Sequence, residues 1–318
     1  MERLSAVRVE KMLDRLDKEL LNKIADINDM PVGAYNIRKN GKGAGRNTTK
    51  NINITNKKDN PGIDVYVKPG TKNESAYVPV ILSETGFEDT VYNTFVIGED
   101  ADVTIIAGCG IHNEGESTSK HDGVHEFFVH KGAKMKYIEK HYGEGDGLGH
   151  RELNPTANFE VFEDAIVELE MVQIKGVDHT VRKTDVLLHD RAKLIVTERL
   201  LTNGGQTADS YINVRLVGED SSCQVISRSV AQGSSKQRFY MTLNGEAKCK
   251  GHIQCDSIIA DQANVESVPK ISSTNAEAEL IHEAAIGRIA NEQLTKLMTI
   301  GIEEKEAEEI IIKGFLGN

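Results

Sequence analysis

The feature that most constrains this chain is a repeat that begins near residue 91. In each copy a short apolar run leads into a polar turn and then a small residue, as in 95–97, 98–100 and Ala101. The small residues recur 26 to 32 positions apart, at Ala101, Ala133, Ala165, Ala192, Ser221, Ala247 and Ala276. A period near 29, with strand-type alternation and no helical periodicity, predicts a mainly β fold of the β-helix type, one coil per repeat.

A second regularity supports this interpretation. The residue two places after each small residue is apolar or cysteine: Val103, Met135, Val167, Leu194, Cys223 and Cys249. In a parallel β-helix these side chains would stack as one inward column, about 4.8 Å per coil. A β-sandwich is the alternative, but its hairpins recur about every 8–12 residues.

The repeat divides the chain into an N-terminal segment at 1–90, a β-helix core at 91–283 and a helical region at 284–318. The N-terminal segment is expected to be α/β. It starts with a helical apolar stripe over 1–25, and the Gly-, Asn- and Lys-rich stretch 38–62 is expected to be a polar loop or mobile hairpin.

The C-terminal region shows helical spacing in two short stretches, 291–298 and 303–312. Two helices this short and acidic cannot form a core of their own. We therefore expect them to pack on the end of the solenoid or on another protein.

Composition excludes several functions for a chain of this length. The 318 residues include 38 Lys and Arg against 49 Asp and Glu, a net charge of −11, so binding to a nucleic acid backbone is not expected. Tryptophan is absent and aromatic residues are 5% of the chain, which disfavours stacking on sugars or bases. The N-terminus does not resemble a signal peptide, and no apolar run is long enough to span a membrane. We expect a cytoplasmic protein with reduced cysteines.

Cys255 is the first candidate for chemistry. It lies eight residues after Ala247, and the same offset in the other repeats gives Cys109, His141, Gln173, Leu200 and Ser229. Strand parity places these positions on the core side. A thiolate there could bind iron or zinc, although a buried thiol can also be only a small apolar group.

His282 and Glu283 follow one coil after Cys255, close enough for the three to form a metal or cluster site. Alternatively, Glu283 faces solvent. Cys223 and Cys249 are expected on successive coils of one column, as a metal pair, a sulfur relay or stacked core thiols.

A second candidate metal site combines Cys109 and His112 with His121 and His125. His141 could add a ligand. The alternative is a polar insertion between coils. The Gly-rich stretch 41–46 lacks the Walker A spacing, so no nucleotide site is expected in this chain.

Several motifs resemble the SufB/SufD family of iron–sulfur cluster assembly proteins. They are His282-Glu283-Ala284-Ala285-Ile286-Gly287-Arg288-Ile289, Glu292-Gln293-Leu294, Gly301-Ile302, Ile310-Ile311-Ile312-Lys313-Gly314-Phe315, Cys255-Asp256-Ser257, Gly123-Val124-His125-Glu126-Phe127, Gly132-Ala133 and Glu139-Lys140-His141. The resemblance covers about 91–318. The presence of Cys255 favours the SufB branch, and the shortness of the chain suggests a compact, archaeal-type form.

The resemblance implies a right-handed parallel β-helix that dimerises, as a homodimer or a SufB/SufD-type heterodimer, with a transient iron–sulfur cluster near the interface. It maps the cluster or sulfur-accepting residues to Cys255 and Glu283, with His282 beside them. It also implies a SufC-type ABC ATPase docked on the C-terminal helices, a sulfur donor and apo-protein acceptors. The residues expected to bind the ATPase are Leu294, Leu297, Met298, Ile310, Ile311 and Phe315.

On this interpretation the chain is an assembly scaffold and not an enzyme, with ATP hydrolysis left to the partner. Two alternatives stand beside it. One is an adaptor that only recruits the ATPase and has inert cysteines. The other is a polysaccharide-active β-helix enzyme, which the lack of tryptophan and of paired carboxylate motifs disfavours.

Overall fold

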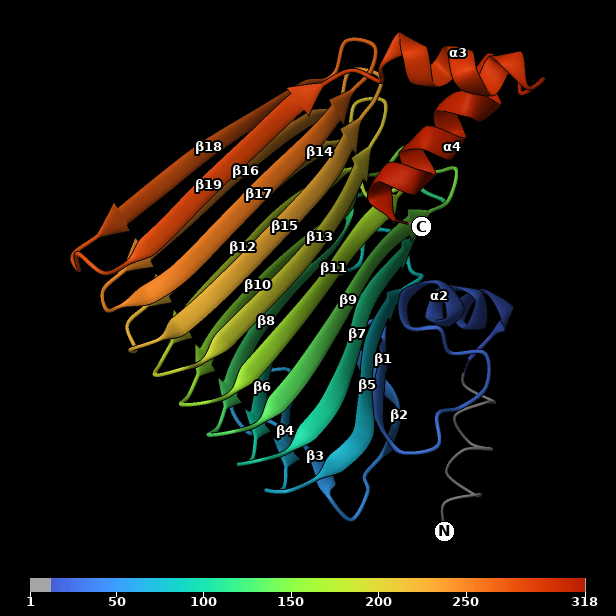
Figure 1. The fold of residues 1–318 in the computed structure, drawn as a ribbon. Coiled ribbons are helices and arrows are strands. Elements are labelled where there is room, and N and C mark those ends of the chain that lie inside the picture. The colour runs from blue at the N-terminus through green and yellow to red at the C-terminus, as the bar shows by residue number, and fades with distance from the viewer. Residues whose placement is uncertain (1–12, 318) are drawn as a thin grey trace.

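Two long sheets wound into a solenoid of about eight turns dominate the computed structural model, which describes residues 13–317 (Figure 1). One sheet has ten strands, in the order β19-β17-β15-β13-β11-β9-β7-β5-β1-β2. Their bounds are β1 Ala34–Lys39, β2 Lys42–Asn47, β5 Lys72–Leu82, β7 Asp102–His112, β9 Lys134–Glu144, β11 Ile166–Lys175, β13 Lys193–Thr202, β15 Ser221–Ala231, β17 Cys249–Ile259 and β19 Glu279–Gly287.

The other sheet has nine strands, in the order β18-β16-β14-β12-β10-β8-β6-β4-β3. They are β3 Ile52–Asn56, β4 Ile63–Val67, β6 Glu88–Ile97, β8 Ser119–Val129, β10 Arg151–Val161, β12 His179–Leu188, β14 Thr207–Leu216, β16 Lys236–Gly245 and β18 Asn264–Ser273. From β4 onward the chain alternates between the sheets, and each strand pairs in parallel with the strand two places later. The predicted parallel β-helix is confirmed.

The repeat has a simple physical origin. The small residues lie at the corner where each coil turns from one sheet to the other, and Ala101, Ala133, Ala165 and Ala192 are fully buried there. Several of these tight turns contain a residue with positive φ, for example Asp100 at 53°. Asp tolerates this left-handed conformation better than bulky residues do.

The register differs from the expectation in the last coils. Cys223 lies opposite Gly251, and Cys249 lies opposite Ser221, because the coil from β15 to β17 has 28 residues and not 26. Cys255 therefore lies beside Ser227 and not beside Ser229. The shift is two residues, so all these side chains still face the core.

Stacked side chains fill the space between the sheets. The rings of Phe95, Phe127 and Phe159 lie in one column, with centroids 4.5 and 4.3 Å apart. The same column continues coil by coil through Val186, Val214 and Leu243 to Ile271.

The N-terminal end of the solenoid is closed by antiparallel strands. Residues 38–62, expected to be a polar loop or mobile hairpin, contain the end of the β1–β2 hairpin and the strand β3, which pairs with β4. Parallel pairing also begins before residue 91, with β1 on β5 and β4 on β6. Charged and Asn-rich strands this short protect the sheet edges at this end.

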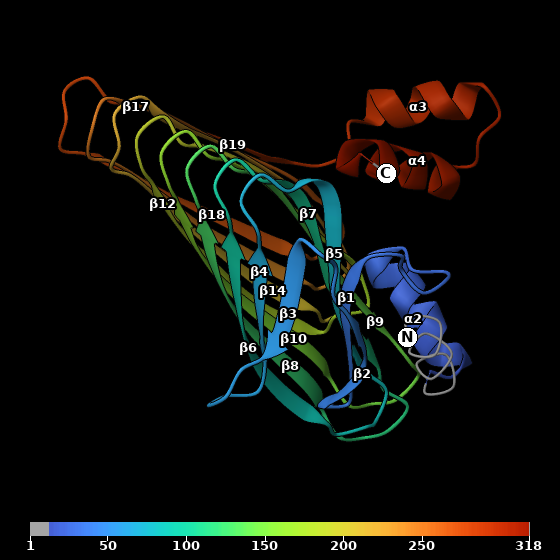
Figure 2. The same ribbon diagram turned by 90° about the horizontal axis from the view of Figure 1, so that it is seen from below.

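One helix, α2 (Arg15–Ala25), lies outside the ten-stranded sheet (Figure 2). It confirms part of the expected helical stripe, whose first twelve residues lie outside the described part of the chain. The helix approaches closely because β7 has no side chain at Gly108, where a Cβ would lie 2.4 Å from the Ile24 carbonyl oxygen.

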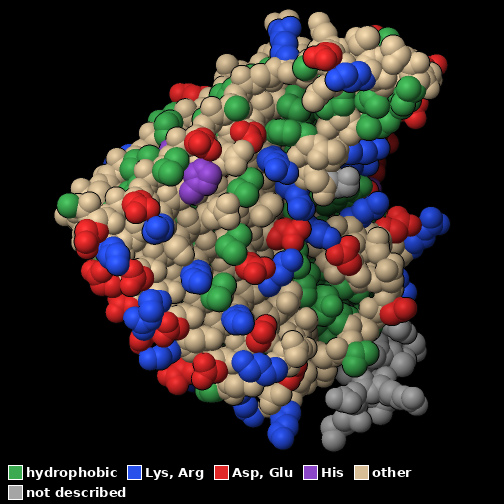
Figure 3. All heavy atoms as spheres, viewed as in Figure 1, with side chains coloured by type: hydrophobic (Ala, Val, Ile, Leu, Met, Phe, Trp, Pro, Cys, Tyr) green, Lys and Arg blue, Asp and Glu red, His purple; other side chains and the backbone are tan. Residues whose placement is uncertain are grey.

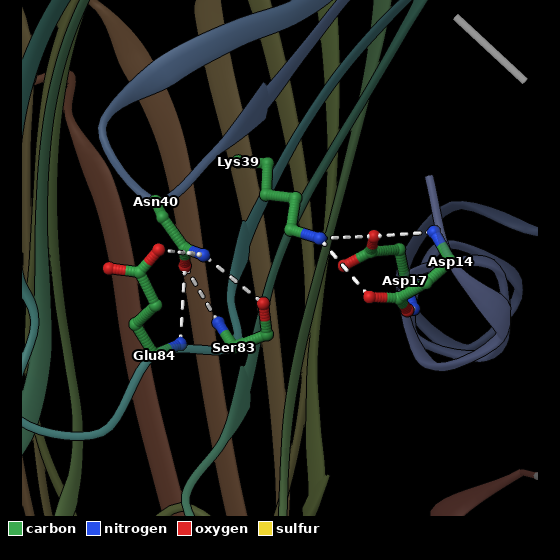
Figure 4. Close-up of polar contacts among 6 residues, drawn as sticks. All are labelled: Asp14, Asp17, Lys39, Asn40, Ser83 and Glu84. Atoms are coloured by element: carbon green, nitrogen blue, oxygen red, sulfur yellow. Dashed lines mark hydrogen bonds and ion pairs between the residues drawn. The ribbon is translucent and has the colours of Figure 1, made fainter. Parts of the chain in front are cut away.

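Polar contacts fix the start of α2 to β1 (Figure 4). Asp14 and Asp17 form a reciprocal capping box, and Lys39 Nζ lies 2.5 Å from Asp17 Oδ2 and 3.3 Å from Asp14 Oδ2. Burial opposes the charge on Lys39, but these hydrogen bonds outweigh it and raise the pKa of the amine. In the adjoining turn, the Asn40 side chain bonds to Ser83 and Glu84.

Two helices follow the last strand, α3 (Asn291–Thr299) and α4 (Glu304–Leu316). They contact each other, and α4 packs on β15 through Ile312 and Leu316, which meet the buried Val230. The expected small helical region is confirmed. None of the helices within residues 13–317 is long and apolar enough to cross a membrane.

Truncating the centre of the phenylalanine stack tests how far the solenoid depends on it. We expect Phe127→Ala to lower the free energy of unfolding by about 3–5 kcal/mol, because a cavity remains between two rings that cannot close it. Urea unfolding followed by circular dichroism measures this change. Phe128→Ala, which removes the neighbouring ring from the outer face, is the matched control and should cost clearly less. Equal losses in the two variants would contradict the stacked-core account.

Candidate functional site

The C-terminal end of the solenoid is open. β18 and β19 are the last strands of their sheets, and within residues 13–317 no strand pairs with their outer edges. Side chains that would be covered by another coil are therefore exposed, including Ile271 and Ile286, each at 44%. Val268 and Ile281 are exposed on the outer faces of the same two strands. This open end, defined here as β18 and β19, is an apolar surface next to unpaired strand edges.

Cys255 lies directly beneath the open end. It points inward from β17 and is only 2% exposed. Its Sγ is 3.4 Å from Met241 Sδ and 3.8 Å from His282 Nε2. His282 Nδ1 and Ser267 Oγ are buried and have no hydrogen-bond partner in the described part of the chain. A thiol one coil below the open end therefore meets an imidazole and an unpaired hydroxyl that belong to the last two strands themselves.

Glu283 does not join this group within one chain. It follows His282 on β19, so it points to the opposite face of the strand. There its Oε2 lies 3.2 Å from His252 Nε2, and 64% of its side chain is exposed. Of the three expected cluster residues, the fold brings Cys255 and His282 together and places Glu283 on the outer face of the same edge.

The environment keeps the buried thiol and the half-buried imidazole uncharged. Burial, followed by the charge of Glu198, raises the pKa of the Cys255 thiol to about 12. Burial, followed by the nearby His252, lowers the pKa of His282. At neutral pH the pair is a thiol beside a neutral imidazole. A metal ion that binds the sulfur must displace the thiol proton, and the imidazole is already in the form that ligates metal.

A line of buried polar side chains leads from the middle of the solenoid to this site. Arg182 lies between two buried carboxylates, with Nη2 3.9 Å from Glu139 Oε2 and Nη1 3.5 Å from Glu198 Oε1. Ser210 and Ser227 each donate a hydrogen bond of 2.7 Å to Glu198. Since Ser227 is the neighbour of Cys255 on the preceding coil, the negative charge of Glu198 reaches the thiol.

This line of buried polar side chains was not predicted from the sequence. The signal was strand parity, because Glu139, Arg182 and Glu198 occupy positions of the inward-facing alternation that are otherwise apolar. A charged residue at such a position must find a buried partner.

Of the four residues of the second expected metal site, the structure places three in the core and one apart from them. Cys109, His121 and His125 point into the core, but His112 lies at the end of β7, where Nε2 is 3.0 Å from Glu114 Oε1. Across residues 13–317 no group of three or more His, Cys, Asp or Glu is placed to hold a metal ion. Instead, Asn93 Nδ2 lies 3.3 Å from His125 Nδ1, and the His121 ring lies 3.6 Å from Asp89. The physical reason is that a long β7 carries His112 out to the sheet end, away from the other three.

All four cysteines are buried and free. Burial raises the pKa of Cys223 to about 12, and Cys249 lies near enough to add to that effect. Both thiols face the core, but they are not opposite each other, because the residue paired with Cys223 is Gly251, two positions after Cys249. They are placed as packing groups, without the imidazole that accompanies Cys255.

The expected docking residues on the helices differ in exposure. Met298 and Ile310 are exposed at 45% and 42%, whereas Leu294, Leu297 and Ile311 are half-buried. Phe315 packs toward the solenoid with Ile312 and Leu316. Ile300, 74% exposed between the helices, was not among the expected residues and adds to this apolar surface.

The fold and the site define a class: a β-solenoid that presents a thiol–imidazole pair at an uncovered end. Residues 82–315 match the family model described as SUF system FeS cluster assembly, SufBD core domain. This span is more than half of the chain, so the chain belongs to the SufBD family of iron–sulfur cluster assembly proteins.

Curated relatives agree with this assignment. An iron–sulfur cluster assembly SufBD family protein of Methanocaldococcus jannaschii is 29% identical over 241 residues, which cover 74% of each chain. Another from Methanothermobacter thermautotrophicus is 29% identical over 261 residues, 80% of this chain and 62% of the relative. One from Archaeoglobus fulgidus is 26% identical over 249 residues, 78% and 66% of the two chains. The chain thus spans about three fifths to three quarters of these relatives.

The buried His125 predicts a specific acid sensitivity. Burial lowers its pKa from 6.5 to about 4, although nearby Glu139 partly opposes this. Between these values the unfolded chain binds a proton that the folded chain excludes. Stability therefore falls as pH falls, by up to about 3 kcal/mol for this group. We expect His125→Gln to lose less stability than the wild type between about pH 7 and about pH 4.5 in urea unfolding.

The control is His130→Gln, in the polar turn that follows β8, the strand that carries His125. Its stability should depend on pH as that of the wild type does. If His125→Gln and the wild type lose the same stability on acidification, His125 is not the source of the effect.

Proposed function

We propose that this chain is a scaffold subunit that builds a nascent iron–sulfur cluster where the open ends of two solenoids meet. The observation that carries the proposal is the Cys255–His282 pair, in which a thiol buried one coil beneath the uncovered apolar surface meets an imidazole on the last strand, β19. Family membership supports the iron–sulfur chemistry, and the open end supports the location.

The unpaired edges of β18 and β19 and their exposed inward-facing residues suggest that a second solenoid covers the open end. Long uncovered edges pair readily with other strands. The two ends of the solenoid also differ: β2 and β3 are short and polar, whereas β19 offers nine residues without proline. A twofold pairing of open ends would bury Ile271 and Ile286 of both copies and extend the sheets across the seam. The same surface would also fit a related SufB/SufD-type chain.

Ligand number points to the same arrangement. Iron–sulfur clusters commonly take about four protein ligands, and thiolate–imidazole mixtures are known among them. One chain supplies one thiol and one imidazole at its open end, so two chains supply four ligands. Glu283, exposed on the outer face of the edge, is proposed to act at the seam toward the partner and not within its own chain.

The helical region is proposed to dock a SufC-type ABC ATPase. Met298, Ile300 and Ile310 are exposed apolar residues on or between α3 and α4, and α4 is anchored to β15 through Ile312 and Leu316. Movement of α4 would be transmitted to the strand that precedes β17 in the sheet, and thus toward Cys255. Such coupling requires that the partner contact the helices differently in its two nucleotide states.

A second function has a specific observation in its favour. The Cys255 thiol is buried and its pKa is about 12, as expected for an inert core cysteine. A chain with an inert Cys255 would be an adaptor that only recruits the ATPase. A scaffold binds a cluster and an adaptor does not, so a measurement of cluster binding distinguishes the two functions.

Reconstitution with ferrous iron and sulfide without oxygen tests the scaffold. We expect wild type to gain visible charge-transfer absorption and Cys255→Ser to lose at least about four fifths of it, because the soft sulfur ligand is removed. Cys223→Ser is the matched control, a buried thiol without an imidazole neighbour, and should keep the absorption. Full absorption in Cys255→Ser would favour the adaptor.

Analytical ultracentrifugation, which measures the oligomeric state, tests the proposed interface between the two open ends. We expect wild type to be dimeric and Ile286→Glu to be mostly monomeric, since a charge at the open end must be desolvated on pairing. Ile195→Glu places the same charge at a residue 40% exposed on the outer face of β13 and should leave the dimer intact. A dimer unaffected by Ile286→Glu would locate the interface elsewhere.

A further inference from the structure

A basic recess lies on the outside of the ten-stranded sheet, between α2 and the C-terminal end of α4. Its volume is about 430 Å³, and its walls include Lys23 of α2, Lys140 and Tyr142 of β9, Lys175 of β11 and Arg199 of β13. Figure 3 shows Lys and Arg side chains gathered in the hollow between the C-terminal helices and α2. The open end with Cys255 is a different part of the molecule.

The charges in this recess are not balanced. Counting the lining residues and those bonded to them, the cations are Lys23, Lys136, Lys140, Lys175, Arg182 and Arg199, and the carboxylates are Asp26, Glu139, Glu144 and Glu170. Glu170 serves two cations, with Oε1 3.0 Å from Arg199 Nη1 and Oε2 3.2 Å from Lys136 Nζ. A cationic surplus stands out in a chain whose net charge is −11.

Two of the lysines have no carboxylate partner. Among residues 13–317, no carboxylate lies within ion-pair distance of Lys23 or Lys175. Lys175 Nζ instead lies over the Tyr142 ring, 5.6 Å from its centroid. These amines come from different elements and approach one hollow, where their mutual repulsion would be relieved by a bound anion.

We propose that this recess binds a compact polyanion, a small molecule with two or more phosphate or carboxylate groups. Its volume lies within the roughly 300–1,000 Å³ typical of small-molecule pockets, which favours a small ligand over a protein segment. The lysines supply point charges on flexible stems, and Arg199 adds a planar donor that matches phosphate and carboxylate oxygens. Val172 and Tyr142 give the floor an apolar part for the body of the ligand.

Isothermal titration calorimetry on the full chain tests this proposal, with sodium pyrophosphate and citrate as separate probes. We expect at least one probe to bind and its affinity to fall as salt is raised, because the interaction is ionic. The preferred probe distinguishes a phosphate ligand from a carboxylate ligand. No binding of either probe at millimolar concentration would overturn the proposal.

The double variant Lys23→Gln/Lys175→Gln removes two charges and breaks no ion pair. We expect it to weaken binding at least about tenfold, which corresponds to about 1.4 kcal/mol. Lys193→Gln/Lys236→Gln removes two exposed charges outside the recess and should change the affinity less than about twofold.

Two further results would overturn the proposal. One is an equal loss in both double variants, which would mean diffuse attraction to the whole surface. The other is that the wild type binds neither probe, while Lys23→Gln/Lys175→Gln no longer docks the ATPase. That result would mean that the recess contacts an acidic surface of a partner protein. Neither result affects the proposal of cluster assembly at Cys255, because that proposal is tested by a different measurement, visible absorption.

Discussion

The structure depends on one constraint: every coil of the solenoid is completed by the next coil. Backbone hydrogen bonds run between coils, and each inward side chain packs on the side chain above it, as in the column from Phe95 to Ile271. A fold of this kind always has two ends that must be covered. The N-terminal end is covered by its own antiparallel strands. At the C-terminal end no strand within residues 13–317 covers β18 and β19, and the same last coil holds His282 above Cys255.

Placing the site at the uncovered end explains how a thiol can be buried and still available. In one chain Cys255 is a protonated thiol in an apolar setting, influenced by Glu198 through a line of buried polar groups. Among the strands that the structure describes, none pairs with the outer edge of β19, the strand that carries His282. A second solenoid would close the site and double its ligands. Burial, charge and oligomerisation are then parts of one arrangement.

Much of the fold could be predicted from the sequence because the solenoid has a linear repeat. The small residues identified the corners, and strand parity identified the inward face. The register of the last coils was wrong because coil length varies, and a coil of 28 residues cannot be told from one of 26 by the small residues alone. The two extra residues moved Cys255 from the level of Ser229 to that of Ser227.

The site was predicted less completely. The structure brings the expected Cys255 and His282 together, whereas parity between adjacent residues turns Glu283 to the outer face, which was the alternative that the sequence left open. His112 lies apart from Cys109, because the two are three residues apart on one strand and so face opposite ways. The basic recess could not be seen in the sequence at all, since Lys23 and Lys175 are brought together only by the packing of α2 on the sheet.

The most direct test of the central claim is the iron and labile sulfide bound per chain, measured across a size-exclusion profile without oxygen for wild type and for Ile286→Glu. If the site is shared between two open ends, iron and sulfide will elute with the wild-type dimer and be absent from the monomeric variant, although that variant still has Cys255 and His282. A monomeric variant that holds as much iron and sulfide per chain as the wild type would contradict the account.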